Sequence, residues 1–228
     1  MDLAATANAA APVLCVDTCA VLDLMRDPTR ETALPHVRQA GFDLIQIAEQ
    51  GGLSILCAEQ VTLEFAENVD AVHEEARQSL KKLRENLSRI DALAAIYGAQ
   101  GAAVIDHLDD HMLRAKALVD RWLTRATTVR PPDEILSKAL ARVNAARAPA
   151  KKGKESFKDC VVFETYLDAA QRLRAAGFRS SIVFVSSNPR EYFEPGTSVL
   201  KAEIAADLAP GVVDFAVSMA HAKNTLGL

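Results

Sequence analysis

Acidic side chains that suit a metal ion stand next to apolar runs of the kind that form buried strands. Asp17 ends the apolar run at residues 13–17, and Glu64 follows a second run, at residues 53–57, by one or two helical turns. Asp159 lies in the first turn of a predicted helix that follows a basic loop. Mg²⁺ and Mn²⁺ prefer carboxylate oxygens, and such ions activate water and stabilise phosphoryl displacement. The three acids therefore predict a metal-dependent hydrolytic site if the fold brings them together.

Each of these acids also has a purely structural interpretation. Asp17 precedes a predicted helix, where an aspartate often serves only as the N-cap. Glu64 is compatible with the exposed surface of a helix, and Asp159 with the favourable end of a helix dipole. The sequence favours metal binding for all three and leaves these alternatives open.

Strand and helix patterns alternate at the two ends of the chain. The predicted strands are residues 13–17, 53–57, 181–185 and 211–215, and the predicted helices between them include 36–50, 156–176 and 198–208. This alternation predicts a parallel sheet of four to five strands with helices on both faces. Sites in such sheets form beyond the carboxyl ends of the strands, where Asp17 stands and where Ser186, Ser187 and Asn188 follow the third predicted strand.

A helical block separates the two α/β parts. Its apolar residues recur with alternating steps of four and three, at positions 76, 80, 83, 87, 90, 94 and 97. This spacing predicts a helix whose apolar seam packs on another helix. Two more helices are expected at residues 102–125 and 133–147. We therefore expect one domain over residues 1–228, with a helical insertion at residues 71–150.

Four segments of the chain resemble the PIN domain family: VLCVDTCAVLDL, LSILCAEQVTLEFAENV, SFKDCVVFETYL and SIVFVSSNPREYF. The resemblance implies a three-layer α/β/α fold and an Mg²⁺- or Mn²⁺-dependent ribonuclease. By motif position, Asp17, Glu64 and Asp159 match the first three acids of the family. The fourth acid falls at Asn188, or less favourably at Ser187. Asparagine keeps an oxygen ligand but lacks the charge, so this chain departs from the family pattern there.

The net charge of −4 hides an uneven distribution. Residues 111–158 contain 12 Lys and Arg against 4 Asp and Glu, a net of +8, so the remainder carries 14 against 26, a net of −12. A basic segment of this kind provides salt-dependent affinity for phosphates, although basic residues also serve as solvated helix faces. The expected nucleic-acid contacts are Arg147, Lys151, Lys152, Lys154, Lys158 and Arg190.

The sequence therefore predicts a metal-dependent endoribonuclease that cleaves single-stranded RNA, with Asp17, Glu64, Asp159 and Asn188 as catalytic and metal-binding residues. The asparagine motivates an alternative, a PIN-like module that binds nucleic acid or protein without catalysis. DNA remains open as a substrate. The helical block also suggests a protein partner, either a second copy of the chain or an antitoxin-like protein.

The remaining features concern the compartment. The four cysteines form no CxxC pair and have no histidine at zinc spacing, which favours free thiols and a cytoplasmic location. No apolar run approaches the roughly 20 residues of a membrane span. The alanine-rich N-terminus, residues 1–12, lacks the basic and leucine-rich parts of a signal peptide, so we expect a frayed leader.

Overall fold

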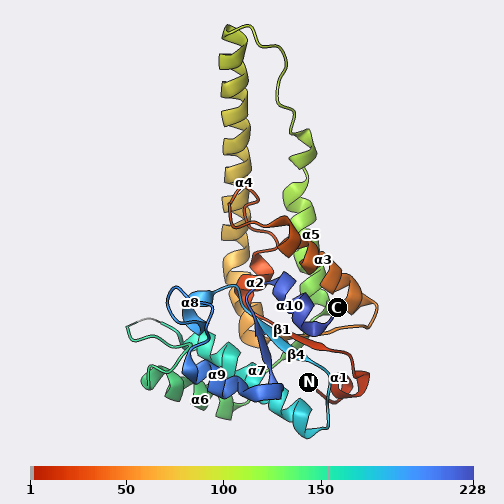
Figure 1. Cartoon of the computed structure of the whole chain (residues 1–228), viewed down its shortest axis with the longest axis vertical. Helices are drawn as coiled ribbons and strands as arrows, with labels where there is room; N and C mark the ends of the chain where they lie inside the picture. The colour runs from red at the N-terminus through yellow and green to blue at the C-terminus, as the bar shows by residue number, and fades with distance from the viewer. Residues whose placement is uncertain (1–2, 154) are drawn as a thin grey trace.

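The computed structural model describes residues 3–153 and 155–228. It contains a parallel sheet of five strands in the order β3-β2-β1-β4-β5 (Figure 1). The strands are β1 (Val13–Val16), β2 (Ser54–Ala58), β3 (Thr127–Val129), β4 (Ile182–Val185) and β5 (Asp214–Ala216). The predicted α/β/α class is confirmed. Every residue of β1 and β4 is buried, as expected for strands covered on both faces.

Helices form a layer on each side of this sheet. The helices are α1 (Leu3–Ala9), α2 (Thr18–Leu22), α3 (Pro35–Glu49), α4 (Glu59–Ile96), α5 (His111–Arg125), α6 (Asp133–Asn144), α7 (Phe157–Ala175), α8 (Pro189–Tyr192), α9 (Ala202–Val212) and α10 (Met219–Leu226). One layer contains α3, α5 and α10, and the other contains α7 and α9, with α6 packed on α7 (Figure 1). The carboxyl ends of β1 and β4 lead into α2 and α8, so polar residues there share one edge of the sheet.

A buried tyrosine ties the two central strands to the helix behind them. The hydroxyl of Tyr166, on α7, donates to the carbonyl of Val16 at 2.5 Å and accepts from the backbone N–H of Ala58 at 2.9 Å. Its ring also lies 5.3 Å from the ring of Phe184 on β4. The tyrosine therefore fixes the ends of β1 and β2 relative to each other and to α7.

We expect Tyr166→Phe to lower the free energy of unfolding by about 1–3 kcal/mol, because the buried N–H of Ala58 loses its acceptor. Urea denaturation measures this change. Tyr97→Phe is the control, since Tyr97 is 88% exposed and its substitution should change nothing. Equal stability of the two variants would show that the hydroxyl contributes nothing to the fold.

The block predicted as a helical insertion, residues 71–150, is not helical throughout. It contains β3, which pairs with β2 as the edge strand of the sheet. The helix predicted at 102–125 begins only at His111, after a short 3₁₀ turn at Asp106–Leu108. Gly98, with a positive φ of 84°, ends α4 just after its C-cap, and Gly101, with a φ of 114°, lies in the extended segment that follows. The insertion boundaries and the single domain remain predictions.

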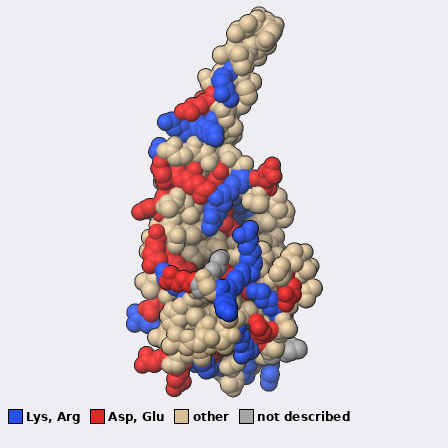
Figure 2. All heavy atoms as spheres, turned by 90° about the vertical axis from the view of Figure 1, so that its left-hand side faces the viewer, with Lys and Arg blue, Asp and Glu red and all other residues tan. Residues whose placement is uncertain are grey.

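The long helix α4 projects beyond the rest of the molecule (Figure 1). The lower part of its predicted apolar seam is packed, since Ala76 is fully buried, but Ile90 is 55% exposed. The chain returns from the tip as an extended segment, so the upper seam faces no helix within the described residues. On the face that Figure 2 shows, the tip has no Lys, Arg, Asp or Glu. The expected protein partner stays a prediction.

The N-terminus differs from the expected frayed leader. From Leu3 to Ala9 it forms α1, which packs on α7 and buries Leu3 and Thr6; the first two residues of the predicted leader lie outside the described residues. All four cysteines are free, as predicted. Among the helices described, none has both the length and the apolar character required to cross a membrane.

Candidate metal and active site

Asp17 stands at the edge of the sheet, directly after β1. Its backbone N–H donates to the carbonyl of Val185 at 3.0 Å, which fixes it against the end of β4. Its Oδ1 accepts from the N–H of Thr18 at 2.7 Å, so the residue does cap α2. Its Oδ2 accepts from the Ser186 hydroxyl at 2.6 Å and from the Cys19 thiol at 3.0 Å. Helix capping therefore occupies only one oxygen of this carboxylate.

Ser186 was predicted to stand at the carboxyl edge of the sheet, but Asn188, or less favourably Ser187, was preferred as the ligand. Val16 and Val185 are register partners in β1 and β4, so the residues that follow them, Asp17 and Ser186, are neighbours at the sheet edge. Ser186 is fully buried and also accepts from the N–H of Asn188 at 3.3 Å. Its position directly after a strand is equivalent to that of Asp17, which is why the two side chains meet.

Glu64 is linked to Asp17 through Thr18, which contacts both carboxylates. It lies near the start of α4, and its Oε2 accepts from the Thr18 hydroxyl at 2.9 Å. Gln60, one turn earlier, donates to its Oε1 at 3.2 Å. Thr18 thus donates to both carboxylates, one through its backbone and the other through its hydroxyl.

The pKa shifts of the Asp17 and Glu64 carboxyl groups are consistent with the proximity of the two side chains. Burial raises the pKa of Asp17 above its usual range, only partly opposed by the hydrogen bonds from Ser186 and Cys19. Burial also raises the pKa of Glu64, and the charge of Asp17 raises it further. Two partly buried carboxyl groups therefore share this edge of the sheet.

Asp159 approaches the same region from the first turn of α7. Burial is the main reason that the pKa of the Tyr192 hydroxyl is raised, and the charges of Asp17 and Asp159 both add to it. Both carboxylates therefore lie close enough to Tyr192 to act on it. The neighbouring Lys158 donates to Glu67 Oε2 at 2.7 Å, which links the start of α7 to α4.

The carboxylates present fit a hard divalent cation in chemical type. Neither Asp17 nor Glu64 forms an ion pair with a Lys or Arg in the described part of the chain, although both are withdrawn from water. The charge of Lys158 lowers the pKa of Glu64 but only partly opposes the effect of burial. Partly buried carboxylates without an ion-pair partner suit Mg²⁺ or Mn²⁺. Within residues 3–153 and 155–228, however, no three His, Cys, Asp or Glu side chains are gathered closely enough to form a ready-made metal site.

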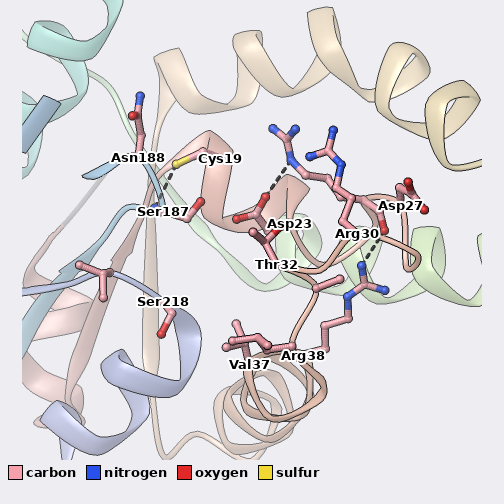
Figure 3. Close-up of a pocket in the computed structure, with 14 residues that line it drawn as sticks. Cys19, Asp23, Asp27, Arg30, Thr32, Val37, Arg38, Ser187, Asn188 and Ser218 are labelled. Atoms are coloured by element: carbon pink, nitrogen blue, oxygen red, sulfur yellow. Dashed lines mark hydrogen bonds and ion pairs between the residues drawn. The ribbon is translucent and has the colours of Figure 1, made fainter. Parts of the chain in front are cut away.

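The Asn188 side chain makes no hydrogen bond to Asp17 or Glu64. Its amide makes no hydrogen bond in the described part of the chain and points away from the nearby Cys19 and Ser187 (Figure 3). The contact with Asp17 on this strand end is made instead by Ser186. A ligand role for Asn188 therefore stays a prediction.

The predicted nucleic-acid contacts fall into two groups. Arg147 forms an ion pair with Asp207, and Lys158 forms one with Glu67. The side chains of Lys151, Lys152 and Arg190 form no ion pair among the described residues, whereas Lys154 lies outside those residues. The ion pairs of Arg147 and Lys158 show that acids distant in the sequence neutralise part of the positive charge of the basic segment.

Comparison with known families agrees with this architecture. A family model described as a PIN domain matches residues 14–192, which include Asp17, Glu64 and Asp159. No curated protein and no solved structure matches significantly. Because the matched region covers most of the chain and the sheet has the expected parallel order, the chain belongs to the PIN domain family.

Proposed function

We propose that the chain is an endoribonuclease that cleaves single-stranded RNA with Mg²⁺ or Mn²⁺. PIN domains are generally nucleases and typically use divalent metals. The observation that carries the proposal is the pair of Asp17 and Glu64, which are partly buried, are joined through Thr18 and form no ion pair with a Lys or Arg among the described residues.

In this proposal, Asp17 and Glu64 hold the metal, with Asp159 as a third acid and Asn188 completing the set. The bound metal supplies polarisation of the phosphodiester and a lower pKa for an attacking water. The protein contributes orientation, because Ser186 and Thr18 fix the carboxylate oxygens that they contact. Lys151, Lys152 and Arg190, whose side chains have no ion pair among the described residues, are proposed to attract the RNA backbone.

Cleavage of a fluorophore-quencher single-stranded RNA tests this function directly. We expect activity with Mn²⁺ or Mg²⁺, none after EDTA treatment, and a loss on the order of 10²-fold or more in Glu64→Gln, which removes one charged ligand. Glu85→Gln is the matched control because Glu85 lies exposed on the same helix and its ion pair, with Lys81 at 3.8 Å, is also exposed. Activity that persists in EDTA or in Glu64→Gln would contradict the proposal. A matched single-stranded DNA determines whether the enzyme is specific for RNA.

Metal binding should also stabilise the fold. A ligand that binds only the folded state adds about 2.7 kcal/mol at 100 times its dissociation constant. We therefore expect Mn²⁺ to raise the melting temperature of the wild type and of Glu85→Gln, but much less that of Glu64→Gln. An unchanged melting temperature of the wild type at millimolar Mn²⁺ would favour the alternative of a PIN-like binding module without catalysis.

A further inference from the structure

A cavity of about 530 Å³ opens beside the candidate carboxylates (Figure 3). Its volume lies within the range of about 300–1,000 Å³ that is usual for small-ligand sites. Cys19, Ser187 and Asn188 line one end, and Arg30 and Arg38 line the other. Cys19 is also the residue whose thiol donates to Asp17, so one side chain separates the cavity from that carboxylate.

The arginines that line the cavity differ in whether a carboxylate forms an ion pair with them. Arg30 forms an ion pair with Glu75 on α4. Nε of Arg26 lies 2.7 Å from Asp23, although the contact lacks hydrogen-bond geometry. Arg38 reaches no carboxylate at ion-pair distance among the described residues.

Arg38 is held in place without being neutralised. It donates to the backbone carbonyl of Arg26 at 2.6 Å, while its own Nε is buried and has no hydrogen-bond partner among the described residues. Burial lowers the pKa of the Arg38 guanidinium, and the charges of Asp23 and Asp27 only partly oppose this effect. A positive group without an ion-pair partner among the described residues is therefore fixed at the end of the cavity away from Asp17, where an anion would pair with it.

The other walls suit the remainder of a nucleotide. Ser218 lines the cavity and caps α10, so the positive end of this helix dipole also faces it. Leu34, Val37 and Val217 provide an apolar surface. A duplex keeps its bases stacked inside, whereas a single strand can place one unstacked nucleotide in such a pocket.

We propose that this cavity is a nucleotide subsite that takes one nucleotide of a single-stranded nucleic acid next to the scissile position, with its phosphate on Arg38 and its sugar and base against the apolar wall. The role of the subsite in cleavage depends on the proposed nuclease function. Its binding of a nucleotide does not depend on that function. The subsite extends the substrate path to the side of Asp17 lined by the first turn of α3 and the N-cap of α10.

Binding to an inactive protein tests the subsite separately from cleavage. In the Asp17→Asn background with EDTA, fluorescence anisotropy of a short labelled single-stranded RNA measures the dissociation constant at several salt concentrations. We expect Arg38→Gln to weaken binding on the order of tenfold, as for the loss of one charge-assisted hydrogen bond, and to reduce the salt slope by about one. Arg172→Gln is the control of equal charge, because Arg172 lies exposed on α7 and contacts Asp168.

A second variant keeps the test valid if Arg38→Gln disturbs the fold. Val217 is 39% exposed on the cavity wall, so Val217→Trp fills the cavity without emptying the core. We expect weaker binding with an unchanged salt slope, because no charge is lost. If both variants bind RNA as tightly as Arg172→Gln, the subsite is wrong. Loss of binding in both variants supports it even if the wild type proves unable to cleave RNA, which would overturn the nuclease function alone.

Discussion

Asp17→Asn is expected to lower metal-dependent RNA cleavage by about 10³-fold or more, which is the factor that several kcal/mol of lost metal stabilisation produces. Asparagine keeps the shape of the side chain and one acceptor oxygen, but it removes the charge that would hold the metal. Initial rates of cleavage of single-stranded RNA with Mn²⁺ measure the effect. Asp120→Asn is the control, since Asp120 pairs with Lys116 on the exposed side of α5. Wild-type rates in Asp17→Asn would overturn the assignment of the site.

The same substitution should not destabilise the metal-free protein. Burial raises the pKa of Asp17 in the folded state, so the stability linked to its protonated form is present at low pH and lost as pH rises through the folded pKa. Asparagine stays neutral throughout. In EDTA at neutral pH we expect Asp17→Asn to melt at the temperature of the wild type or above it, and any difference to shrink on acidification. A markedly lower melting temperature would mean that the charged aspartate is needed for folding.

Arg142→Met is expected to lower the free energy of unfolding by about 3–5 kcal/mol, the usual cost of removing one partner of a buried ion pair. The Arg142 side chain is 4% exposed and pairs with Glu164 at 2.5 Å and with Asp207 at 2.8 Å. It also lies over the ring of Phe163, 4.9 Å from its centroid. Methionine fills the space but leaves two largely buried carboxylates without the cation that they share. Urea unfolding at neutral pH measures the loss.

Arg147→Met is the matched control. Arg147 pairs with the same Asp207, but its side chain is 45% exposed, so its loss should cost at most about 1 kcal/mol. Adding Glu164→Gln and Asp207→Asn to Arg142→Met should recover part of the stability, because the stranded charges are then removed. Equal stability of Arg142→Met and Arg147→Met would refute a role of the buried cluster in holding α6 on α7 and α9.

Local patterns were sufficient for most elements of the central sheet. Strands β1, β2 and β4 appear in the sequence as short apolar runs because both of their faces are covered. Strand β3 has only three residues, Thr127–Val129, and two of them are half-buried. Strand β3 is too short to appear as an apolar run, and it lies within the basic segment. Residues 71–150 were therefore predicted to be purely helical. Edge strands are partly solvated, and their patterns are correspondingly weak.

The site was predictable to the extent that its residues follow strands directly. Asp17 ends an apolar run, and its place at the carboxyl edge of the sheet follows from that alone. The contact with Ser186, rather than with Asn188, depends on the register Val16↔Val185 between strands 166 residues or more apart, which no local pattern encodes. The Thr18 hydroxyl bond to Glu64 depends in the same way on how α4 leaves β2.

The sequence by itself determined the α/β class, the PIN resemblance and the separation of charge along the chain. Only the tertiary structure decided which charges are compensated: Arg142 is buried between two acids, Lys158 is paired with Glu67, and Arg38 is left without a carboxylate at ion-pair distance among the described residues. The physical reason is that periodicity records which face of an element is buried, whereas ion pairing depends on distances of a few ångströms between elements far apart in the chain.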